Sequence, residues 1–193
     1  MAGHARYTAV LDACALYSAA VCDSLMSLAV AGLYAAKWTT AIEDEWMRNL
    51  ETNRPELAGR LTMRRDAMRA AVADWEVEPA AWQALAARPE LPDKDDAHVL
   101  AAAIAGHADC IVTFNLKDFP QEALAPFGIE ALHPDDFILA QLDLDPFTAI
   151  AAFKHMRARR KRPQESAEIF AAGLRRNGLV LTAVRLMEAA ELI

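Results

Sequence analysis

The chain has 193 residues, of which 54% are hydrophobic, and it carries a formal net charge of −7. The hydrophobic content excludes a disordered chain, and the length suffices for one domain with a sizeable core plus a small appendage. The negative charge argues against a protein that coats nucleic acid nonspecifically, but it is compatible with an enzyme that has a local basic patch.

The N-terminal two-thirds of the chain is predicted to alternate helices with short apolar strands. We expect strands at residues 7–11, 110–114 and 129–132, with a weak candidate at 75–77. We expect helices at 18–36, from Ala41 onward, around 61–75, at 79–87 and from Asp95 or Asp96 to about 105, where Gly106 stops the last one. This alternation implies a mostly parallel sheet that is covered on both faces.

After Pro134 the sequence predicts helices alone. We expect helix starts at Asp135-Asp136, at Pro146 and at Pro163, an end at Asn177-Gly178, and a last helix that reaches Glu191. We therefore expect a first domain at residues 1–140 and a helical extension at 141–193, with a loose boundary near 142–145.

The cysteines and the apolar runs predict a cytoplasmic protein. Cys14, Cys22 and Cys110 have no CxxC spacing, which is typical of reduced thiols. The longest apolar stretch, residues 28–36, is too short to span a bilayer. Asp12 interrupts the N-terminus before the core of a signal peptide could form.

Acidic residues recur where the predicted elements begin or end. Asp12 directly follows the first apolar run, and acidic residues are depleted within strands, so it indicates either a site or a helix cap. In an open α/β sheet the carboxyl ends of the strands face the ligand site, where clustered carboxylates repel one another unless a hard cation neutralises them. The pattern favours a Mg²⁺ or Mn²⁺ site, since no His or Cys ligand set accompanies it.

Two other acidic groups allow both a structural and a functional interpretation. The segment Thr40–Glu43 fits a capping box, which leaves Glu45 weakly preferred as the functional acid. Asp93, Asp95 and Asp96 exceed what capping one helix needs. After the strand at 110–114, Asn115 and Asp118 fit an Asx-turn or a place beside a metal, and Thr113 has the hydroxyl to hydrogen-bond a carboxylate or a water.

Positive charge concentrates in the tail. Residues 141–193 carry a net charge of +3 and the remainder −10, and six of the nine basic residues of the tail lie between Lys154 and Arg162. A basic stretch on an acidic protein is what binding of a polyanion requires, and it is equally typical of the end of a solvated helix. Arg157, Arg159 and Arg160 are the candidate phosphate contacts.

Taken in order, four motifs resemble those of PIN-domain ribonucleases, and most closely the long VapC-type toxins with a helical C-terminal extension. The motifs are Val10-Leu11-Asp12, Thr39-x₅-Glu45, the run from Asp96 to Ala103, and the run from Val112 to Phe119. The resemblance covers roughly residues 7–139.

This resemblance implies a three-layer α/β/α fold with a central parallel sheet, and metal-dependent hydrolysis of RNA. It implies that Asp12, Glu45 and Asp96 hold Mg²⁺ or Mn²⁺, with Asp93 or Asp118 as further acids. Asn115 stands where many members carry aspartate, which lowers the local negative charge. A cognate antitoxin protein and a homodimer are expected on the same basis.

Other functions also fit the motifs. A PIN-like fold with a weakened site could be an interaction module, which predicts little metal binding and no cleavage. A non-toxin RNA-processing nuclease would share the same site. A receiver-like phosphorylation domain fits less well, because Lys117 is the only candidate for its lysine and the order of the acids differs.

Overall fold

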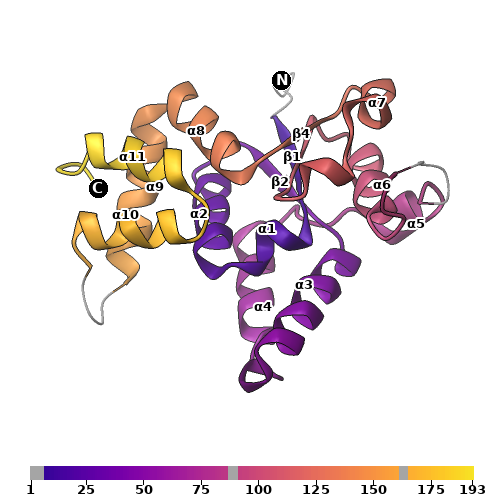
Figure 1. Ribbon diagram of the computed structural model, residues 1–193, viewed down its shortest axis with the longest axis horizontal. Helices are drawn as coiled ribbons and strands as arrows, with labels where there is room; N and C mark the ends of the chain where they lie inside the picture. The colour runs from indigo at the N-terminus through magenta and orange to yellow at the C-terminus, as the bar shows by residue number, and fades with distance from the viewer. Residues whose placement is uncertain (1–6, 87–90, 161–164) are drawn as a thin grey trace. The chain divides into compact units, whose positions relative to one another are not determined.

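A computed structural model describes residues 7–86, 91–160 and 165–193, and it is built around a short parallel sheet (Figure 1). The strands are β1 (Thr8–Leu11), β2 (Ala35–Lys37), β3 (Cys110–Val112) and β4 (Glu130–Leu132), in the order β2-β1-β3-β4. Val10 of β1 pairs with Lys37 on one side and with Ile111 on the other. The order makes β1 the point from which the chain builds outward in both directions, which is where α/β sheets place ligands.

The chain divides into two compact units that do not follow the sequence order. Unit 1 comprises the described residues up to Tyr17 together with residues 34–133, and unit 2 comprises residues 18–33 and 134–193. The predicted division into 1–140 and 141–193 stays a prediction, but one helix of the N-terminal stretch belongs to unit 2.

In unit 1, helices flank the parallel sheet, which confirms the predicted fold class. Helix α6 packs on β1 and β3, α7 on β4, and α1 packs against α3. The α-helices of this unit are α1 (Ala13–Tyr17), α3 (Thr40–Asn53), α4 (Thr62–Ala71), α5 (Pro79–Gln83), α6 (Ala97–Ala105) and α7 (Gln121–Leu124). Short 3₁₀ turns lie at η1 (Pro55–Leu57), η2 (Leu116–Asp118) and η3 (Ala125–Phe127).

Unit 2 contains helices alone among its described residues. They are α2 (Ala19–Val30), α8 (Pro134–Leu144), α9 (Pro146–Arg159), α10 (Ala167–Arg176) and α11 (Val180–Glu188). Helix α2 packs against α8, α9 and α10, and α11 packs against α8 and α10. The predicted helix start at Pro146 is confirmed, whereas Pro163 lies outside the described residues and α10 is capped by Ser166.

The prediction of a helix at residues 18–36 was wrong for the residues after Val30. Helix α2 ends at Val30, and Gly32 adopts the left-handed region with φ +83°. The amide of Leu33 then donates to the carbonyl of Leu28, which closes the helix as glycine-terminated helices commonly do. The alanines that follow form β2, and Trp38 pairs with residues 75–77 through a single bridge.

The cap of α3 lies one residue before the predicted position. The Thr39 hydroxyl, not that of Thr40, accepts the Ile42 amide at 3.2 Å. Glu43 therefore has no capping-box partner at Thr40. It is 1% exposed, accepts the indole N–H of Trp38 at 2.9 Å, and pairs with Arg69.

None of the helices in the described parts of the chain is long and apolar enough to cross a membrane.

The N-terminus of α11 is capped by a residue of another helix. Leu179 precedes α11 and offers no side-chain cap, but the buried carboxylate of Asp135 on α8 accepts the amides of Leu181 at 2.7 Å and Thr182 at 2.8 Å. Asp135, which we expected to start its own helix, thus joins α8 to α11.

We expect Asp135→Ala to lower the free energy of unfolding by about 1–3 kcal/mol, because one buried and one partly buried amide lose their acceptor. Urea unfolding measures this loss. Asp136→Ala removes an equal charge from the exposed neighbour and should stay within about 0.5 kcal/mol of the unmodified protein. Equal losses in the two variants would contradict the capping role.

Candidate active site

Asp12 lies at the carboxyl end of the central strand. It follows β1 directly and is 2% exposed, while its backbone amide donates to the Val112 carbonyl at 3.1 Å. Its own carbonyl accepts the amides of Ala15 and Leu16, which start α1. The backbone on both sides of Asp12 is therefore fixed, and its side chain stays at the edge of the sheet.

Two side chains donate to the same oxygen of the Asp12 carboxylate. The Thr113 hydroxyl reaches Oδ2 at 2.7 Å and the Cys14 thiol reaches it at 2.9 Å. Burial raises the pKa of Asp12 and the charge of Glu45 adds to this, whereas the bonds from Cys14 and Thr113 oppose the rise. Cys14 was not among the predicted site residues, because a lone cysteine two residues after Asp12 gives no signal in the sequence and its other partners, Thr113 and Phe114, lie about a hundred positions further along the chain.

The pKa of Asp96 reflects the acids that surround it in the site. It occupies the N-cap position of α6, yet its side chain caps nothing. Burial, and then the charges of the surrounding acids, raise the pKa of Asp96 to about 7; these acids are Asp12, Asp93, Asp118 and Glu45. All four predicted partners of Asp96 thus share its electrostatic environment.

The other acids before α6 have more ordinary surroundings. Asp93 is exposed and accepts the Asp95 amide at 2.9 Å, as an Asx-turn does. Asp95 is exposed as well, and its carbonyl contacts the His98 ring. These contacts favour Asp96 over Asp95 as the ligand of the predicted pair.

Glu45 lies beside a histidine. His98 Nε2 is 3.4 Å from Glu45 Oε2, an ion-pair distance, and Nδ1 of the same ring is 2.7 Å from the Asp95 carbonyl. Burial opposes the charged form of His98, but the contacts with Glu45 and Asp95 outweigh it and raise the pKa of the imidazole. Glu45 is half-buried on the site side, while Glu43 is committed to Trp38 and Arg69.

The loop after β3 brings the last predicted residues to the same edge of the sheet. The Asn115 amide donates to the Thr113 hydroxyl at 2.9 Å, and the Asp118 amide donates to the Asn115 carbonyl at 3.0 Å. Asn115 is exposed and Asp118 is half-buried. The loop therefore presents one neutral amide and one carboxylate near Asp96.

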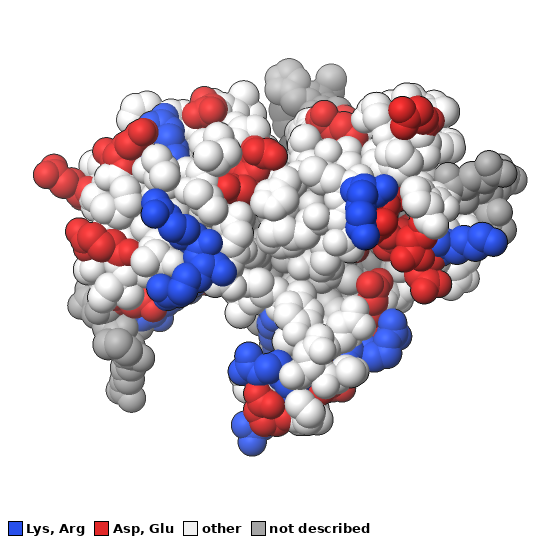
Figure 2. All heavy atoms as spheres, in the orientation of Figure 1, with Lys and Arg blue, Asp and Glu red and all other residues white. Residues whose placement is uncertain are grey.

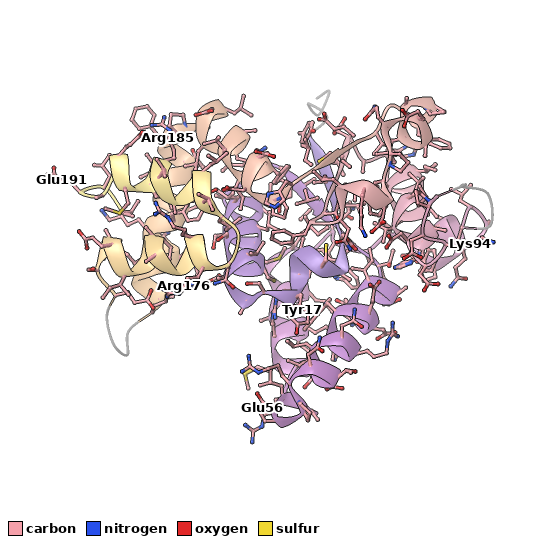
Figure 3. All side chains as sticks on the ribbon, in the orientation of Figure 1. Tyr17, Glu56, Lys94, Arg176, Arg185 and Glu191 are labelled. Carbon is pink, nitrogen blue, oxygen red and sulfur yellow. The ribbon has the colours of Figure 1, made fainter. Side chains whose placement is uncertain are left out.

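The donor set fits a hard divalent cation. It consists of carboxylate and amide oxygens, and after burial the charges of the neighbouring acids add to the rise in the pKa of Asp96. Figure 2 shows acidic side chains gathering on unit 1 near α6, close to the Lys94 labelled in Figure 3. Among residues 7–86, 91–160 and 165–193, no three His, Cys, Asp or Glu side chains already stand in metal-binding geometry.

The three predicted arginines of the tail have partners inside unit 2. Arg157 donates to the Glu165 carbonyl at 2.8 Å, and Arg159 pairs with Asp23 at 2.6 Å. Arg160 pairs with Glu165 at 3.1 Å. Their role in binding RNA stays a prediction, and these contacts give each of them a structural role.

Other basic groups of unit 2 are more accessible. Arg175 and Arg176 lie exposed at the end of α10, where Figure 3 labels Arg176, and within the described parts of the chain neither forms an ion pair.

Comparison with known proteins assigns both parts of the chain. A model described as PIN domain matches residues 8–117, and a model described as VapC50 C-terminal domain matches residues 134–188. A protein of Mycobacterium tuberculosis (strain ATCC 25618 / H37Rv) named "Putative ribonuclease VapC50" is 65% identical over 49 residues, which are 25% of this chain. The matched segment covers 29% of that relative's length. No solved structure was found to match. Because the PIN-domain model covers more than half of its length, the chain belongs to the PIN-domain family.

Proposed function

We propose that the protein is a metal-dependent endoribonuclease and the toxin of a toxin–antitoxin pair. The observation that carries this proposal is the group of acids around Asp96 at the end of a parallel sheet, where burial and then the charges of Asp12, Asp93, Asp118 and Glu45 raise its pKa. The resemblance to VapC-type toxins and the relative named a ribonuclease support RNA as the substrate. They also support a cognate antitoxin protein as partner, whereas the homodimer and the cytoplasmic location rest on the sequence expectations alone.

Asp12, Glu45, Asp96 and Asp118 would hold Mg²⁺ or Mn²⁺, with Asp93 as a further acid at the rim. When bound, the cation lowers the pKa of a coordinated water and stabilises negative charge on the phosphate. The other tasks, such as orienting the ligands, fall to the side chains of the protein. Thr113 donates to Asp12 and so fixes the orientation of the carboxylate that lies deepest in the site.

The surroundings of Glu45 and Asp96 differ. His98 lies beside Glu45, and although burial opposes the charged form of the imidazole, the contacts with Glu45 and Asp95 raise its pKa. Asp96 stays partly protonated at neutral pH in the absence of a cation, because its pKa is about 7. Asn115, at the exposed end of the loop, offers an amide to substrate phosphate without adding charge.

We expect Asp12→Asn to leave the fold intact and to lower RNA cleavage by at least about a hundredfold, because a neutral amide is a poor ligand for a hard cation. The assay is cleavage of total cellular RNA by purified protein with Mg²⁺ or Mn²⁺, with EDTA as the control. An Asp12→Asn protein as active as the unmodified one would rule out this mechanism. If folded, antitoxin-free protein binds no Mn²⁺ and cleaves nothing, the interaction-module function replaces the nuclease.

Two neighbouring glutamates on α3 should separate function from stability. We expect Glu45→Gln to reduce cleavage by about tenfold or more with an unchanged midpoint of unfolding, since Glu45 faces the acids of the site. Glu43→Gln should lower the free energy of unfolding by about 1–3 kcal/mol, screened in part because Arg69 is about one-third exposed, and should keep cleavage per folded molecule. Urea unfolding and cleavage assays on both variants test this prediction. If Glu43→Gln lost cleavage and Glu45→Gln lost stability, Glu43 would be the residue of the site.

The pH dependence of stability that comes from Asp96 should disappear when a cation is added. Asp96 has a folded pKa of about 7 against an ordinary 3.8, so the folded state retains a proton that the unfolded state has lost in that window. Metal-free protein should therefore lose stability as pH rises from about 4 to 7, and the pKa of Asp12, which burial raises, adds to the decline in the same direction. Its charged neighbours are Asp12, Asp93, Asp118, Glu45 and His98.

Thermal unfolding measured over this pH range, with and without Mn²⁺, tests the prediction. The cation should abolish the decline by taking the place of the proton. Asp96→Asn should flatten the metal-free profile, and an unaltered profile in that variant would show that another group titrates.

A further inference from the structure

Cys14 makes contacts that neither the proposed mechanism nor the sequence motifs use. It lies in the first turn of α1, and its thiol donates to Asp12 Oδ2 at 2.9 Å. The same sulfur accepts the backbone amide of Phe114 at 3.2 Å. Cys14 therefore connects the start of α1 with the loop that follows β3.

The hydrogens at this point can be assigned one by one. The Thr113 hydroxyl has a single hydrogen, which goes to Asp12 Oδ2 at 2.7 Å, and its oxygen accepts the Asn115 amide at 2.9 Å. Cys14 Sγ lies 3.3 Å from the same hydroxyl oxygen. The contact of the thiol with Asp12 Oδ2 is the shorter one, 2.9 Å against 3.3 Å to the Thr113 oxygen, and it ends on a carboxylate, so the thiol hydrogen is directed to Asp12 and two donors from different segments act on one carboxylate oxygen.

We propose that Cys14 is a positioning residue that holds the Asp12 carboxylate in the orientation required for cation binding. This inference rests on the proposed function, because it concerns the same site. The thiol fixes Oδ2 from the side of α1 while Thr113 fixes it from the side of β3, so the carboxylate cannot rotate without breaking a contact. The amide of Phe114 fixes the sulfur in turn.

The contact also couples Asp12 to the other acids. Asn115 and Asp118 belong to the loop that begins with Thr113 and Phe114, and both of those residues touch Cys14. Loss of the thiol should loosen this loop as well as the carboxylate. Groups that orient metal ligands typically affect metal affinity or activity by about 10–100-fold when they are removed.

The test compares three cysteine variants and Asp12→Asn by calorimetric titration with Mn²⁺, and then by steady-state RNA cleavage. Cys14→Ala should weaken Mn²⁺ binding about tenfold and lower kcat, with KM for RNA unchanged. Cys14→Ser keeps a donor on a shorter bond and should recover part of the loss. Cys110→Ala removes a more deeply buried thiol from β3, where no contact with Asp12 is found among the described residues, and should bind Mn²⁺ normally.

Circular dichroism establishes that each variant is folded, and Cys14→Val replaces the alanine variant should that one fail to fold. Normal Mn²⁺ affinity in the folded alanine or valine variant would overturn the proposal. Equal losses in Cys14→Ala and Cys110→Ala, or no recovery in Cys14→Ser, would overturn it too. If the unmodified protein binds no Mn²⁺, or Asp12→Asn binds it equally well, the proposed function itself fails, so the two failures are distinguishable.

Discussion

The carboxylate of Asp12, buried at the end of the central strand, is the constraint on which the site depends. An ionised carboxylate that leaves water loses several kcal/mol of solvation, and the loss must be offset by donors or by a positive charge. The fold supplies donors from two directions, from α1 through Cys14 and from the end of β3 through Thr113. The parallel pairing of β1 with β3 brings Leu11 opposite Val112 and so makes both donors reach one oxygen.

The acids around Asp96 extend this argument from one residue to a group. Each added carboxylate raises the free energy needed to ionise its neighbours. The ionised carboxylates of the metal-free site therefore repel one another, and the fold has to keep them close. One local compensation is present, since His98 places a basic ring beside Glu45. A site that is costly without a ligand binds a divalent cation more favourably, because the cation removes the repulsion in addition to forming its own bonds.

The sequence predicted the fold class and the strands β1, β3 and β4, because these features depend on local patterns. An acid that follows an apolar run, as Asp12 does, marks the end of a strand whatever the rest of the chain is. The second strand was missed because Ala35 and Ala36 continue an alanine-rich helix pattern, and only the left-handed turn at Gly32 separates them. Pairwise contacts between distant segments could not be predicted, since nothing in the neighbourhood of Cys14 indicates Thr113.

The same limit explains why charged residues were harder to assign than apolar ones. Asp135 and Asp136 are indistinguishable in the sequence as helix-starting acids, yet only Asp135 is buried against α11. The arginines of the tail looked like a phosphate-binding stretch, but Arg157 and Arg159 reach partners in other segments of unit 2. A charge pattern gives the number of ionic groups, whereas the fold decides which of them remain available to a ligand.

The helical extension packs against α2, a helix from the N-terminal part of the chain. Helix α2 lies within the segment matched by the PIN-domain model, yet it packs with α8, α9 and α10, and its Ser24 hydroxyl lies 3.7 Å from Met156 Sδ on α9. Val21, Leu25 and Leu28 of α2 are fully buried. A chain cut after residue 140 would leave α2 without α9 and α10, so apolar surface next to α1 in the sequence would face water. The helical extension therefore covers the apolar residues of α2, a helix of the segment matched by the PIN-domain model, even though its own residues are remote in sequence.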